Sequence, residues 1–276
     1  MRIRRLSTLK RKEPKEILLA RLPDVIAITD YARSRAFAVN RLIRRIFGDS
    51  YEWYGFTLGS KARPEVVADI GLPVNDCNVH QYTGVDPEHI ARFQESLPAD
   101  VVINGWIHSH GSLAYKTFSP VDAANHRTVL DFVSPFLKKP VASRQVVVEE
   151  LLPLTEEESR SAPPGRGNVW VVTDRPVSRA SIFEVVYGSF CYALLVGDGG
   201  WHRQEIHFET RGILTGTTHS GHTEAAMVRA ENGRAFAKED EESLEQEIRE
   251  KIVPGAPAFS DSMHSREREI GSLGSN

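Results

Sequence analysis

The stretch 101–122 reads VVINGWIHSHGSLAYKTFSPVD, and its first ten residues form the strongest β-strand pattern in the chain. Branched and aromatic apolar residues dominate this segment up to His108, which is typical of a buried strand. Residues two apart on a strand point to the same face, so His108 and His110 can present two imidazoles to one point. This geometry suits a metal ion, although a His-x-His pair also arises by chance in a chain with ten histidines.

A helix is expected to begin directly after this segment, at Ser119-Pro120-Val121-Asp122, and to reach about Leu137. Serine is a good N-cap, proline fits the first helical position, and an early aspartate complements the helix dipole. Taken alone, the pattern says only that a helix starts. Downstream of two histidines, however, it adds a carboxylate, and two histidines, one carboxylate and a water suit a catalytic zinc ion.

The residues upstream alternate between helix and strand patterns. Apolar residues at three-and-four spacing predict a helix from Thr29 or Asp30 to Phe47, ended by Gly48. The run Tyr51–Leu58 predicts a strand with Glu52 at the head of one face. Further strands are expected at 66–72, 79–82, 145–152 and 168–173, a helix at 86–97, a polar loop at 153–167, and a hairpin formed by 189–196 and 201–208.

Two segments carry a family resemblance. The string His108-Ser-His110, eight residues, Ser119-x-x-Asp122 resembles the motif of the JAMM (MPN-plus, or JAB) zinc metalloproteases. The segment 52–59, EWYGFTLG, resembles the glutamate segment that precedes this motif in the family. Two departures are visible: the spacer 111–118 is one residue longer than the usual seven, and Gly111 stands where many members have proline.

The resemblance implies an α/β fold with a curved mixed β-sheet flanked by helices, of the cytidine-deaminase-like type, with flexible N- and C-terminal extensions. We therefore expect a basic N-terminal extension at 1–23, a JAMM/MPN metalloprotease domain at 24–215 and a charged, partly helical or disordered tail at 216–276.

The resemblance also implies a function. His108, His110 and Asp122 would bind one Zn²⁺ per chain, Glu52 would be the general base, and the Ser119 hydroxyl would stabilise the oxyanion. The expected reaction is hydrolysis of a peptide or isopeptide bond that removes or processes a ubiquitin-like modifier, as in prokaryotic deconjugating members. Two alternatives stay open: a non-catalytic MPN-type scaffold, and a peptidase with a cell-wall or phage-assembly substrate.

Composition excludes several other classes of protein. Lys and Arg number 34 against 37 Asp and Glu, so the chain as a whole is not built to coat nucleic acid. It has no apolar run of about 18 residues, so we expect no membrane span. Cys77 and Cys191 lie far apart and form no motif, which favours a reducing, cytoplasmic compartment and disfavours a thiol protease. The oligomeric state is left open.

A few remaining features have two interpretations. Residues 1–45 hold 13 Lys and Arg against four Asp and Glu, which favours a solvated arm over a docking arm for an acidic partner or nucleic acid. His219 and His222 flank a polar turn and are expected at the surface. His126 follows Asp122 by one helical turn, so it either supports the metal site or lies on an ordinary helix face.

Overall fold

The computed structural model describes residues 17–78, 87–149, 179–231 and 233–254. The chain divides into two compact units. The larger unit comprises Pro23–Leu137, Phe190–Phe208 and His222–Asn276, and the smaller unit comprises Met1–Leu22, Lys138–Ser189 and Glu209–Gly221. Both units contain strands, and the larger one also holds the helices that are described below.

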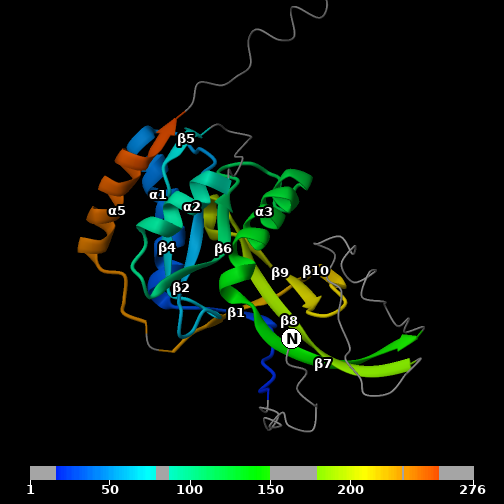
Figure 1. Cartoon of the computed structure of the whole chain (residues 1–276). Coiled ribbons are helices and arrows are strands. Elements are labelled where there is room, and N and C mark those ends of the chain that lie inside the picture. The colour runs from blue at the N-terminus through cyan, green and yellow to red at the C-terminus, as the bar shows by residue number, and fades with distance from the viewer. Residues whose placement is uncertain (1–16, 79–86, 150–178, 232, 255–276) are drawn as a thin grey trace, which may run out of the picture. The chain divides into compact units, whose positions relative to one another are not determined.

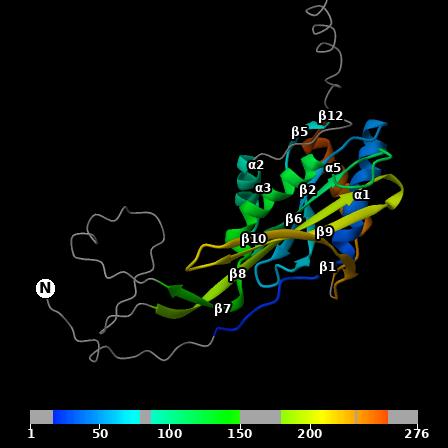
Figure 2. The same cartoon turned by 90° about the vertical axis from the view of Figure 1, so that its right-hand side faces the viewer.

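Three of the helices follow the sequence prediction. Helix α1 spans Asp30–Phe47, α2 spans Pro87–Ser96 and α3 spans Pro120–Leu137. The Thr29 hydroxyl oxygen caps α1 by accepting a hydrogen bond from the Ala32 N–H, and Gly48 ends the helix with a φ of 75° that glycine adopts without strain. Figures 1 and 2 show α1 on one face of the central strands and α2 and α3 on the other.

The central sheet mixes parallel and antiparallel neighbours, which confirms the predicted α/β class. Its strand order is β10-β9-β8-β6-β2-β4, and β7 also pairs with β8. Strand β6 pairs with β2 in the antiparallel sense and with β8 in the parallel sense. The strand bounds are β2 Tyr54–Ser60, β4 Asp69–Gly71, β6 Val101–Ser109, β7 Lys139–Glu149, β8 Arg179–Val196, β9 His202–Gly212 and β10 Thr218–Glu224.

Two small sheets complete the fold. One has the order β11-β1-β3, with β1 at Val25–Ile28, β3 at Val66–Val67 and β11 at Ala226–Arg229. The other pairs β5, Asn75–Asn78, with β12, Ile252–Pro254. The pairings β1–β3, β1–β11 and β5–β12 are all parallel, and they join segments that are far apart in the sequence.

The strand predicted at Tyr51–Leu58 was wrong at its start, because β2 begins only at Tyr54. Trp53 is fully buried just before the strand, and its indole N–H donates to the Asn40 side chain on α1. The first ladder pair joins Tyr54 to His108. Glu52 therefore lies in the segment leading into β2 and not on the strand itself.

Other boundaries also shift. The single strand expected at 66–72 is two strands in different sheets, because Val66 and Val67 pair with β1 whereas Asp69–Gly71 pairs with β2. Strand β5 has a polar sequence and was not predicted, and β7, β8 and β9 are longer than expected. The strands predicted at 79–82 and 168–173 and the loop at 153–167 lie outside the described residues.

In the smaller unit, the fully buried carboxylate of Glu184 on β8 joins β7 and β8 to the turn between β9 and β10. The backbone N–H groups of Leu214 and Thr215 each donate to it over 3.1 Å, and the Arg144 guanidinium on β7 also donates to it. Burial alone would raise the pKa of Glu184, but these hydrogen bonds outweigh it and lower the pKa to about 2.

The region after 216 carries more regular structure than the sequence indicates. Besides β10, β11 and β12 it contains helix α5, Lys238–Lys251, which lies beside α1 (Figure 1). The buried residues of α5 are Leu244 and Ile248. Ion pairs join the two helices along their length: Arg35–Glu247, Arg41–Glu241 and Arg45–Glu245. Among the described residues, no helix is long and apolar enough to cross a membrane.

Candidate metal centre

Three side chains that the sequence singles out meet at one end of β6. His108 lies on this strand, His110 follows its last residue, and Asp122 lies in the first turn of α3. All three are buried, and each offers a donor atom that is within 4.8 Å of the others. The described residues can therefore hold a metal ion at this point, with the ligands that the sequence predicts.

The Asp122 carboxylate faces both imidazoles. Its Oδ1 atom lies 3.1 Å from His108 Nε2, and its Oδ2 atom lies 3.6 Å from His110 Nε2. Burial alone would raise the pKa of Asp122, but the two histidines and the Ser119 N–H hold it well below its ordinary value. Asp122 is consequently a carboxylate at neutral pH, which is the form that binds a metal ion.

The orientation of His110 is fixed from its other side. Its Nδ1 atom lies 2.8 Å from the carbonyl oxygen of Tyr115. A carbonyl can only accept, so Nδ1 carries the hydrogen and the neutral ring keeps its lone pair on Nε2, which faces Asp122. A carbonyl partner of this kind is common behind a metal-binding histidine, where it fixes the tautomer and the ring.

His108 supplies the test of whether the site suits a metal ion. Neither of its ring nitrogens meets the criteria for a hydrogen bond to a described residue, although Nε2 lies 3.1 Å from Asp122 Oδ1. Its ring stacks on Trp106 with centroids 4.2 Å apart, which holds the plane in place. Burial lowers the pKa of His108, which keeps the imidazole neutral. A buried, neutral and unsatisfied imidazole beside a carboxylate fits Zn²⁺, which accepts nitrogen and oxygen ligands.

No protein-family model matches this chain, and a search of the curated proteins also finds no match. The functional argument for this site therefore depends on its own residues and geometry, together with the motif resemblance described above.

Glu52 lies beside this cluster without belonging to it. The residue is 7% exposed, and its carboxyl group interacts electrostatically with His110 and Asp122. Burial and the negative charge of Asp122 raise the pKa of Glu52 to about 7, against the opposing effect of His110. A carboxyl group with a pKa near neutrality can both accept and return a proton, as a general base requires.

Ser119 forms a reciprocal cap with Asp122 at the start of α3. The Ser119 N–H donates to Asp122 Oδ2 over 2.6 Å, and the Ser119 hydroxyl oxygen accepts from the Asp122 N–H at 3.2 Å. This contact uses the oxygen and leaves the hydroxyl hydrogen able to donate. The helix-start interpretation is thus correct, and it is compatible with the oxyanion role that the resemblance implies.

The backbone conformation at position 111 explains why glycine, and not proline, stands there. Its φ is +50°, whereas a proline ring fixes φ near −65°. The Gly111 N–H donates to the Ser109 hydroxyl oxygen, and its carbonyl accepts from the N–H of Asp198 in the β8–β9 turn. The loop after His110 therefore leaves the strand along a path that proline cannot follow.

Sequence reasoning missed three groups near the metal ligands. Trp106 lies two residues before His108 and so on the same face of β6, a position that strand periodicity could have identified. The Tyr115 carbonyl is a backbone group, which leaves no mark in a sequence. Trp201 lies with its ring centroid 6.4 Å from that of His110 and comes from a turn 91 residues away in the chain.

The other candidate residues do not belong to the ligand set. His126 is fully buried against Trp106 and is 6.1 Å from His108 between ring centroids, so it lies next to the metal ligands and not on an exposed helix face. His219 and His222 are exposed, as predicted. Cys191 is fully buried, and burial raises the pKa of its thiol, which makes it a poor nucleophile.

Proposed function

We propose that this protein is a zinc-dependent hydrolase of peptide or isopeptide bonds with a JAMM/MPN-type fold. The observation that carries the proposal is the buried cluster of His108, His110 and Asp122, with the carboxyl group of Glu52 next to it. Three protein ligands and one open position are typical of catalytic zinc, whereas structural zinc sites are closed by four protein ligands. The motif resemblance supports the same assignment.

Each residue has a distinct role in this reaction. When bound, a zinc ion supplies a Lewis acid and lowers the pKa of a water toward about 7. Glu52 accepts the proton of the attacking water and returns it to the leaving amine, a task that suits its pKa of about 7. The Ser119 hydroxyl donates to the oxygen of the attacked carbonyl as negative charge develops there. The Tyr115 carbonyl keeps His110 in the metal-binding tautomer.

The substrate class follows from the resemblance. JAMM enzymes typically remove ubiquitin or ubiquitin-like proteins from lysines or trim such modifiers, so the proposed substrate is a ubiquitin-like protein or its conjugate. A non-catalytic scaffold would have no need for a complete ligand set, and here the ligands, the general base and the serine are all present.

The proposal is tested with ubiquitin and a panel of bacterial ubiquitin-like proteins, each joined by an isopeptide bond to a lysine of a fluorescent peptide. The zinc-loaded protein should cleave at least one member of the panel, and a chelator should abolish this cleavage until zinc is restored. Cleavage that persists in chelator would exclude metal-dependent hydrolysis. A zinc-loaded protein that binds a modifier but cleaves none of the conjugates would support the scaffold.

A further inference from the structure

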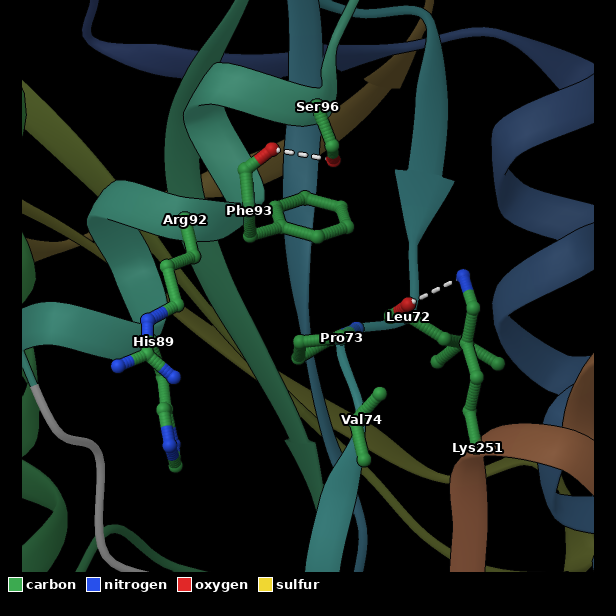
Figure 3. A pocket seen from close by; sticks show the side chains of 8 residues that line it. All are labelled: Leu72, Pro73, Val74, His89, Arg92, Phe93, Ser96 and Lys251. Atoms are coloured by element: carbon green, nitrogen blue, oxygen red, sulfur yellow. Dashed lines mark hydrogen bonds between the residues drawn. The ribbon is translucent and has the colours of Figure 1, made fainter.

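A cavity of about 430 Å³ opens in the larger unit, and its lining includes none of the three proposed metal ligands. It lies between the residues that follow β4, one side of α2 and the last residue of α5 (Figure 3). Cavities of about 300 to 1,000 Å³ commonly hold small ligands or side chains, and this cavity is near the lower end of that range. Its volume suits one or two large side chains.

The pairing of the strands places this cavity at the same end of the sheet as the metal centre. Strand β2 pairs with β4 through Phe56 and Gly71, and with β6 through Tyr54 and His108. The antiparallel β4 therefore ends at the edge where β2 begins, and Glu52 belongs to the segment that leads into β2. Neighbouring strands lie about 4.8 Å apart, so β4 lies two strand spacings, about 10 Å in all, from the strand that carries His108.

The floor of the cavity is apolar. Leu72 and Pro73 are buried, Phe93 of α2 packs on Phe56 with ring centroids 5.2 Å apart, and Val74 is 53% exposed at the entrance. An exposed valine beside a preformed apolar floor can bury further area when a ligand binds, and burial of apolar area is the main source of affinity.

The rim of the cavity carries basic side chains. His89 and Arg92 project from α2 on one side, and Lys251 lies on the other, as Figure 3 shows. Lys251 is held by the Leu72 carbonyl and by Glu247, at 2.8 and 2.7 Å. Within the described part of the chain, the Arg92 guanidinium pairs with the exposed Glu88, a type of contact that contributes little and exchanges readily. Among the described residues that line the cavity, none is acidic.

We propose that this cavity, here called the recognition cavity, binds an acidic-apolar segment of the protein substrate: a large aliphatic or aromatic side chain on the floor, with a neighbouring carboxylate near Arg92 and His89. The inference rests on the proposed function. The occupant is inferred to be the substrate because the cavity lies at the end of the sheet that carries the proposed metal ligands. A partner with exposed apolar and acidic residues complements both the floor and the rim.

The test uses three fluorescently labelled peptides: Gly-Glu-Leu-Asp-Gly, its amide analogue Gly-Gln-Leu-Asn-Gly, and Gly-Glu-Ser-Asp-Gly. Binding to the full chain is measured by anisotropy in the presence of a chelator, so that no hydrolysis occurs. We expect the first peptide to bind with a Kd below about 1 mM. Loss of the leucine side chain should weaken binding by about tenfold, and loss of the two carboxylates by two- to fivefold.

Two substitutions and a matched control locate the site. Arg92→Gln and Val74→Ser should each weaken binding of the first peptide by two- to fivefold, and both residues are exposed enough for the fold to tolerate the change. Arg33→Gln makes the same charge change on an exposed residue of α1 and should leave binding unchanged. Absence of binding, equal binding of all three peptides, or an equal effect of Arg33→Gln would overturn the recognition cavity.

These outcomes are separate from those of the proposed function. If the peptides bind as expected but zinc-dependent cleavage is absent, the hydrolase assignment fails and the cavity remains a binding site. If cleavage is present, Arg92→Gln should raise KM for a cleaved conjugate by two- to fivefold and leave kcat unchanged. A fall in kcat with an unchanged KM would contradict a recognition role.

Discussion

Glu52 accepts and returns the proton in the proposed mechanism, so its replacement separates metal binding from catalysis. Glu52→Gln keeps the size of the side chain but cannot accept a proton. We expect zinc content to stay at the wild-type level and the rate of cleavage to fall by about 10² to 10⁴. Zinc analysis and single-turnover cleavage on the same preparation test this expectation. Wild-type cleavage would remove Glu52 from the mechanism, and loss of zinc would make it a ligand or a structural support.

Ser119 has two roles that a matched variant can distinguish. Ser119→Ala removes the cap of α3 and the proposed oxyanion donor. Thr29→Ala removes the cap of α1 and a hydrogen bond from the Thr29 hydroxyl to the Ala68 carbonyl, but no proposed catalytic group. Each should cost about 0.5 to 2 kcal/mol of stability in thermal melts. Only Ser119→Ala should also slow cleavage, by about 10² to 10³ with zinc retained. Equal turnover in the two variants would leave Ser119 a cap alone.

Glu184 makes the smaller unit sensitive to acid. Its pKa in the folded protein, about 2, lies below the ordinary value of 4.5, so the ionised form stabilises the fold. This contribution is complete above about pH 4.5 and disappears as the pH falls toward 2. Glu184→Gln should therefore melt at a lower temperature than the wild type at pH 7, with a difference that shrinks between pH 4.5 and 2. A difference that is constant across this range would contradict the assignment.

At this scale the sequence predicts side chains better than backbone groups. His108, His110 and Asp122 follow from strand periodicity and a helix-start pattern, because both rules concern neighbours in the chain. The Tyr115 carbonyl and the ring of Trp201 reach His110 through a loop and a distant turn. Neither a carbonyl nor a turn contact has a signature in residue type, so neither could be predicted.

Among the elements, α5 shows how a helix with a weak sequence pattern is held in place. Leu244 is fully buried beside α1, and Leu244→Ala should cost about 2 to 5 kcal/mol of unfolding free energy. Glu242 is 66% exposed on the same helix, and Glu242→Ala should change stability by less than about 0.5 kcal/mol. Denaturant unfolding of the two variants checks the difference. Similar values for both would mean that α5 does not pack on α1.

The elements that the sequence predicts well are those with many buried apolar residues. Helix α1 buries a full stripe and was predicted to within a residue, whereas α5 buries only Leu244 and Ile248 and pairs its acidic residues with arginines about 200 positions away. Strand β2 begins late because Trp53 turns into the core. Strand β5 gains its partner β12 from the far end of the chain, which local propensity cannot reveal.

On the scale of the whole molecule, the α/β class was predictable because strand and helix patterns alternate along the chain. The division into two units was not, because strands β8 and β9 run through both of them. Parallel pairing between β1 and β11 likewise leaves no turn signal in the sequence. Long-range pairing, rather than local pattern, decides this part of the architecture.

Zinc-dependent cleavage should not be affected by reagents that modify thiols. Cys191 is fully buried with a raised thiol pKa, and the proposed mechanism uses no cysteine. Alkylation of the native protein with iodoacetamide should leave zinc-dependent cleavage within about twofold of the untreated rate. Abolition of cleavage by alkylation, with zinc retained, would favour a cysteine mechanism.

Zinc stoichiometry tests the central claim most directly, because it requires no knowledge of the substrate. Elemental analysis of the purified protein should give about one zinc per chain. His108→Ala, His110→Ala and Asp122→Ala should each reduce this value to near zero, because two remaining protein ligands hold the ion weakly. His222→Ala removes an exposed histidine outside the cluster and should keep the full value. Full zinc occupancy in folded His108→Ala and His110→Ala proteins would contradict the account.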